Sequence, residues 1–206
     1  ILDGSDSDQL ISLPERLASD PNFFVAIVVG STQAGGELEG DEEEKAITEQ
    51  NARLAERLRN CWTGFPGRLE NGGVDAAAFS SWIEQAVETS KENGCWEQVQ
   101  FLVGELLFRV PWADGAPQDL VCEWLEKLES RSVQAGFEAA IRNDRGVWMK
   151  SPVEGGIQEA ELAECYAAAR DKVRIKWPRA AASLGRVVED YRNFAVAEDK
   201  RAERYR

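Results

Sequence analysis

The residue types that carry most enzyme chemistry are sparse in this sequence. Histidine is absent from all 206 residues, which excludes Ser–His–Asp and Cys–His nucleophile pairs, histidine-ligated zinc and the histidine pH switch. The four cysteines, Cys61, Cys95, Cys122 and Cys165, include no C-x-x-C pair, and each falls in a helical apolar pattern. We therefore expect reduced, buried thiols and no cysteine-based catalytic or metal site.

Carboxylates are the remaining side chains that could hold a divalent metal. A run of acidic residues between positions 37 and 44 stands beside several glycines. Neighbouring carboxylates in a flexible segment do not converge on one ion without a folded scaffold. We interpret the run as a solubilising linker followed by the acidic first turn of a helix. The sequence thus predicts no cofactor and no metal site, but a carboxylate-dependent enzyme whose Asp and Glu converge only in the fold stays open.

Two groups of cationic residues could bind a partner. The first lies in the irregular stretch 143–156, whose glycine pair Gly155-Gly156 precedes a helix start that could receive an anion. A packed connector with Trp148 buried is the competing interpretation. The second group follows position 169, where the alternatives are ordinary solvated helix surface, an acidic protein partner and, least favoured, nucleic acid. The candidate interaction residues are Arg145, Trp148, Lys150, Arg170, Arg174, Lys176 and Arg179.

The charge of the chain is large and unevenly distributed. The formal net charge is −13, which disfavours nucleic-acid binding because that affinity begins with phosphate neutralisation. Residues 170–206 nevertheless carry eleven Lys and Arg against six Asp and Glu. This asymmetry favours a protein partner, a neighbouring domain of the same chain or a second copy. No membrane partner is expected, since the longest apolar run, 23–29, is far too short to span a bilayer.

The elements that must position these residues are helices. Apolar residues recur at helical spacing along the chain, and no run alternates with period two, so we expect no sheet of consequence. Local signals mark several boundaries: Asp20-Pro21 and Asp75 as helix starts, Gly64 as a stop and Pro178 as the start of the last helix. The fold class predicted is all-α, an irregular multi-helix bundle or solenoid-like stack of about eight or nine helices.

The length fits one large domain or two small ones, and we expect residues 1–206 to form a single helical domain with a flexible Gly/Glu-rich segment at 30–41. The chain opens at Ile1 without a methionine, which suggests a piece of a longer protein. Reduced thiols and the lack of a visible export signal favour the cytoplasm.

Several segments together carry a resemblance to a known family. They are LASDPNFFV, VDAAAFSSWIEQA, GELLFRVPWADGAPQDLVCEWLEKLESRSVQAGFEAAIRNDRGVW, EGGIQEAELAECY, WPRAAASL and YRNFA. Taken together, these segments resemble a helical region near the C-terminal end of long bacterial proteins, a domain of unknown function. The resemblance covers nearly the whole chain apart from the Gly-rich acidic segment. It implies a bacterial source and a fragment origin, and it brings no activity, ligand or site residue.

These observations favour a non-catalytic helical module that mediates protein–protein or interdomain contacts in a larger bacterial cytoplasmic protein. The alternative is an enzyme domain that depends on carboxylates and a divalent metal. An enzyme requires a concave pocket in which at least two carboxylates converge. An interaction module instead requires an exposed apolar or charge-segregated patch.

Overall fold

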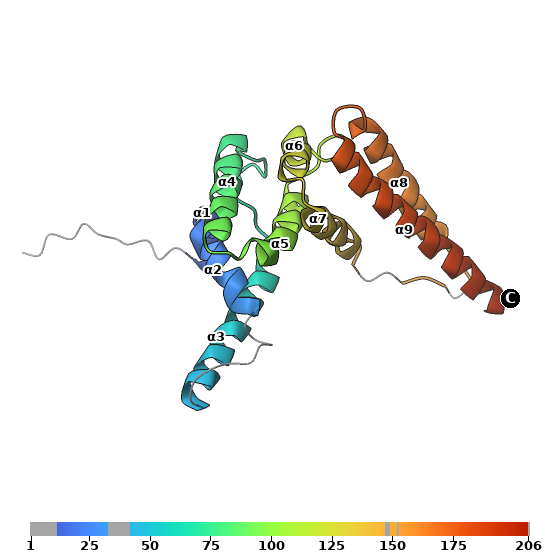
Figure 1. Ribbon diagram of the computed structural model, residues 1–206. Coiled ribbons are helices and arrows are strands. Elements are labelled where there is room, and N and C mark those ends of the chain that lie inside the picture. The colour runs from blue at the N-terminus through green and yellow to red at the C-terminus, as the bar shows by residue number, and fades with distance from the viewer. Residues whose placement is uncertain (1–11, 33–41, 147–148, 152, 206) are drawn as a thin grey trace, which may run out of the picture. The chain divides into compact units, whose positions relative to one another are not determined.

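The computed structural model describes residues 12–32, 42–146, 149–151 and 153–205. The described residues form nine α-helices and a closing 3-10 turn without any strand, so the all-α prediction is confirmed (Figure 1). Two isolated bridges only close tight turns, at residues 68–74 and 113–116. The helices are α1 (Leu13–Ser19), α2 (Pro21–Thr32), α3 (Glu42–Cys61), α4 (Ala76–Glu92), α5 (Trp96–Arg109), α6 (Asp119–Leu128), α7 (Arg131–Asp144), α8 (Ile157–Val173), α9 (Pro178–Ala202) and η2 (Glu203–Tyr205).

Capping side chains explain several of the helix starts. The Asp75 carboxylate accepts hydrogen bonds from the backbone N–H groups of Ala77 and Ala78, both at 3.0 Å. Asp20 accepts from the N–H of Phe23, also at 3.0 Å, directly ahead of α2. Pro178 occupies the first position of α9, where the missing N–H costs nothing. The starts predicted at these residues are therefore confirmed.

The chain divides into two compact units, residues 1–98 and 99–206. The single domain over residues 1–206 stays a prediction. The segment predicted to be flexible, 30–41, begins inside α2, because the helix continues to Thr32. Its remainder, 33–41, lies outside the described residues.

In the first unit, α2 packs against both α3 and α4. Phe24 is buried at the centre, with its ring centroid 5.0 Å from that of Trp82 and 6.0 Å from that of Trp62. Small residues let α2 and α3 approach closely: Ala55 is buried, and its Cβ lies near Gly30. This unit therefore has an aromatic core with an aliphatic seam beside it.

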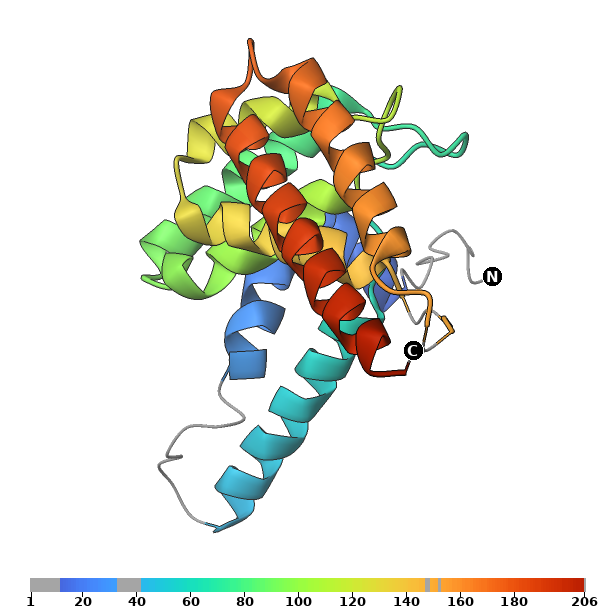
Figure 2. The ribbon, with the colours of Figure 1, turned by 90° about the vertical axis from the view of Figure 1, so that its right-hand side faces the viewer.

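In the second unit, α9 is the helix that α6, α7 and α8 share. It lies side by side with α8 (Figures 1 and 2) and also contacts α6 and α7. Its buried stripe includes Leu184, Val187, Val188 and Tyr191, and the Tyr191 ring stacks on that of Tyr166 from α8 at 5.6 Å. A 25-residue helix thus supplies one apolar face to three partners.

Two glycines set the separation of α5 and α7. A Cβ atom on Gly136 would lie 2.8 Å from the carbonyl carbon of Phe101 and 3.2 Å from the amide nitrogen of Glu105. A Cβ atom on Gly104 would lie 2.8 Å from the amide nitrogen of Phe137. All these atoms are backbone, so the two helices cross with their main chains in direct contact.

Candidate interaction surface

The cationic residues predicted in the loop before α8 converge on one buried carboxylate. Glu159, whose side chain is only 4% exposed, lies 2.5 Å from Arg145 Nη2 and 2.9 Å from Lys150 Nζ. Lys150 Nζ also donates to the Gly155 carbonyl at 3.1 Å and approaches Glu198 of α9 at 3.2 Å. Trp148, predicted as part of the same site, lies outside the described residues. Arg145 and Lys150 therefore tie the loop to α8 and α9.

The charge state of Glu159 follows from this arrangement. Burial raises the pKa of Glu159, but hydrogen bonds from Lys150 and Arg145 outweigh it and leave the pKa below its ordinary value. For Lys150, burial lowers the pKa of the ammonium, and the hydrogen bonds to Glu159 and Glu198 more than reverse that effect. Each partner thus holds the other in its charged form.

Two residues of the second predicted cluster, Lys176 and Arg179, pair with acidic side chains on α6 and at its C-terminal end. Lys176 Nζ lies 2.7 Å from Asp119 Oδ2, and the hydrogen bonds from Lys176 and the Trp177 indole lower the pKa of Asp119. Arg179 donates its backbone N–H to Glu126 at 2.6 Å, and its guanidinium lies 2.8 Å from Glu129. These contacts cap the start of α9.

The other two members of the cluster lie at the end of α8. Arg170 pairs with the neighbouring Asp171 at 3.0 Å. The Arg174 side chain is exposed and has no partner among the residues that the structure describes. The acidic surface expected of a partner is thus supplied in large part by the chain itself. Docking through this cluster stays a prediction, and Arg174 is the residue most available for it.

A buried ion-pair cluster joins α7 and α9. It was not predicted from the sequence. Glu138 has a side chain only 3% exposed, and it receives both guanidinium nitrogens of Arg131, at 2.8 and 3.1 Å. Arg186 of α9 donates to the same carboxylate at 2.8 Å and to Gln134 at 2.6 Å. Glu138 has no sequence signal of its own, because a charge on a helix is ordinarily solvated.

An exposed apolar face lies on α3. Ala52 and Ala55 face α2 and are buried, whereas Ile47 and Leu54 are each 53% exposed. Ile47 and Leu54 are seven residues apart, close to two helical turns, so they share a side of the helix distinct from that of the alanines. α3 has twenty residues against twelve in α2, and its first turns extend beyond the end of α2 (Figure 2).

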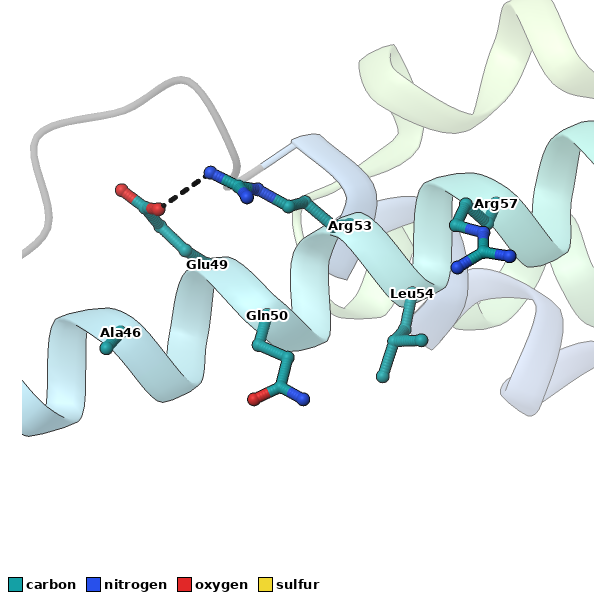
Figure 3. A pocket seen from close by; sticks show the side chains of 6 residues that line it. All are labelled: Ala46, Glu49, Gln50, Arg53, Leu54 and Arg57. Carbon is teal, nitrogen blue, oxygen red and sulfur yellow. Dashed lines mark hydrogen bonds and ion pairs between the residues drawn. The ribbon is translucent and has the colours of Figure 1, made fainter.

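Polar and charged side chains border this face. A hollow of about 400 Å³ runs along the helix (Figure 3), and its lining residues are Ala46, Glu49, Gln50, Arg53, Leu54 and Arg57. Arg53 pairs with Glu49 at 3.1 Å, and both side chains are more than half exposed. The apolar residues of this helix recur at helical spacing, which by itself does not assign them to one face or to two. The five-residue offset between Ile47 and Ala52, about 140° beyond a full turn, is the signal that separates the two faces.

The cysteines depart in part from expectation. Cys95 and Cys122 are buried, and burial raises the pKa of the Cys122 thiol to about 12. Cys61 and Cys165 are exposed, so the prediction that all four are buried is wrong. Both lie on helix faces turned to solvent, a distinction that spacing along one helix does not make. Within the described residues, no group of three or more Cys, Asp or Glu could hold a metal ion.

None of the described helices is long and apolar enough to cross a bilayer. Comparisons with protein-family models, curated proteins and solved structures returned no match to this chain.

Proposed function

We propose that this chain is a non-catalytic helical module that mediates protein–protein or interdomain contacts in a larger bacterial cytoplasmic protein. The observation that supports the proposal is the exposed face of α3, with Ile47 and Leu54 half-exposed on one side of the helix. We call this surface, bordered by Gln50, Arg53 and Arg57, the α3 face.

The α3 face has the composition of a docking surface. Covering the exposed half of Ile47 and of Leu54 would contribute roughly 1 kcal/mol each, given about 1.5–3 kcal/mol for full burial of such side chains. Arg53 and Arg57 border the apolar residues with charge, as in the polar rims of protein interfaces. A helical surface of this kind suits an amphipathic helix laid along it.

Site-specific photo-crosslinking tests the proposal. A photoreactive amino acid at Gln50 would report on the α3 face, and one at Gln85 of α4 is the matched control, since both glutamines are exposed mid-helix residues. We expect crosslinks from position 50 in the host cell, in discrete bands, and far fewer from position 85. Equal crosslinking at both positions, or none at position 50, would contradict the proposal.

A further inference from the structure

We infer that the α3 face binds the α3 face of a second copy of this chain, with the two helices antiparallel. The inference rests on the proposed function and names its partner. It starts from the charges along α3, which differ between the two ends of the helix.

The two halves of α3 carry opposite charge. Residues 42–49 contain four glutamates and one lysine, whereas residues 50–61 contain three arginines and one glutamate. Antiparallel pairing places the acidic half of each helix against the basic half of the other. Parallel pairing would place like charges together. The helix is therefore complementary to itself in one orientation only.

One register satisfies the apolar and the charged residues together. A two-fold axis near Gln50 brings Ile47 of each copy to Leu54 of the other, because the two residues lie about equally far from the axis. The same axis brings Glu49 of each copy to Arg53 of the other. This charged pair lies on the other side of Gln50 from Ile47 and Leu54. Glu49 and Arg53 already pair within one helix at 3.1 Å, so the second copy extends this pair into a network of four charges.

The rest of the first unit argues against other self-contacts. Residues 1–98 contain nineteen Asp and Glu but only seven Lys and Arg. Two copies therefore repel each other over most of this unit, and a self-contact requires a site where arginines are available. Arg53 and Arg57, both exposed, make the second half of α3 such a site. Arg59 lies on the side of α3 that faces α2, where it donates to Ser31 Oγ at 3.3 Å. The small apolar area predicts a weak, reversible dimer.

Sedimentation equilibrium of the purified chain from about 5 to 500 μM tests the inference, since a weak dimer shows only as concentration rises. We expect the apparent mass to rise toward twice that of the monomer. Leu54→Asp should weaken association at least about tenfold, because it places a charge in the apolar contact. Leu13→Asp is the matched control, since Leu13 is 55% exposed on α1, and it should leave association unchanged.

A charge exchange tests the orientation. Glu49→Arg and Arg53→Glu should each weaken the dimer about tenfold, because each turns two symmetry-related attractions into repulsions. The double variant should return to within about twofold of the original association. Circular dichroism should show all variants folded, because both side chains are exposed.

Each contrary result has a separate meaning. A chain that stays monomeric at every concentration, or a dimer indifferent to Leu54→Asp, overturns the second-copy inference. A double variant as weak as the single variants overturns the antiparallel register. If the chain is monomeric while position 50 crosslinks to a different protein, this inference fails and the proposed function stands. If position 50 also crosslinks to nothing, both fail.

Discussion

The crossing of α5 and α7 offers the sharpest test of the packing. Replacing Gly136 with alanine adds one methyl group, which would lie 2.8 Å from the carbonyl carbon of Phe101 and 3.2 Å from the amide nitrogen of Glu105. Both atoms belong to the backbone of a helix, so neither can rotate away as a side chain would. The helices must separate to admit the methyl group.

Two opposing terms set the size of the effect. Alanine is favoured over glycine in a helix interior by about 0.8–1.0 kcal/mol. Overpacking a core costs typically about 1–3 kcal/mol, and the rigid backbone on the far side puts Gly136 at the upper end. The net destabilisation expected is about 2 kcal/mol, which corresponds to a fall in Tm of roughly 8–16 °C for a unit of about 100 residues.

Gly185 of α9 is the matched control. Its added Cβ would meet only Arg170 Cδ, at 3.8 Å, an ordinary van der Waals contact. Gly185→Ala should therefore retain the helix-propensity gain and stabilise the protein by up to about 1 kcal/mol. Urea denaturation followed by circular dichroism measures both variants. If Gly136→Ala proves as stable as Gly185→Ala, the close approach of α5 and α7 is refuted.

Three further outcomes follow from the charged and thiol groups. In urea titrations, Glu138→Ala should lower the free energy of unfolding by about 2 kcal/mol, which is below the range for fully buried pairs because its arginines reach water. Glu164→Ala, which removes an exposed pair, should lower it by under about 1 kcal/mol. Because the folded-state pKa of Glu159 is held below its ordinary value, its stabilisation should be present above the pKa of an unfolded glutamate and be lost as the pH falls through the lower folded-state pKa. Glu159→Gln should lack this loss in pH-dependent melts. Iodoacetamide at pH 8 should modify Cys165 in the folded protein and spare Cys122 until unfolding, as mass spectrometry would show. Equal costs of the two alanine variants, an unchanged acid slope or early labelling of Cys122 would contradict the respective expectation.

Helix identity and several boundaries could be predicted from local signals. Asp75 caps α4 and Pro178 opens α9 because both effects act within one turn of the backbone. The start of α6 is a partial exception. Gln118 precedes it in an extended conformation and does not cap it; its side chain instead donates to the Pro111 carbonyl at 2.6 Å, and the helix begins at Asp119.

The partners of the charged residues could not be predicted from the sequence. Lys176 and Asp119 are far apart in the chain, and no local pattern links them. The same holds for Arg186 and Glu138. The cationic cluster was predicted as a surface for another molecule because its intramolecular carboxylates come from helices whose placement depends on the tertiary fold.

The glycines of the α5–α7 crossing illustrate a different limit. Gly104 and Gly136 lie within strongly helical sequence patterns, where a glycine indicates only a local loss of helix stability. Their role emerges only when both helices are placed, since each glycine makes room for the backbone opposite it.

The position of α9 has a consequence for synthesis on the ribosome. The acidic side chains of α6 and α7 emerge some fifty residues before Lys176, Arg179 and Arg186, with which they pair. Until α9 has left the exit tunnel, those helices lack the apolar stripe and the cations that complete their fold. We therefore expect the second unit to fold only after α9 has emerged, and to do so in a single step. A stalled chain ending before Pro178 should be protease-sensitive throughout α6 and α7.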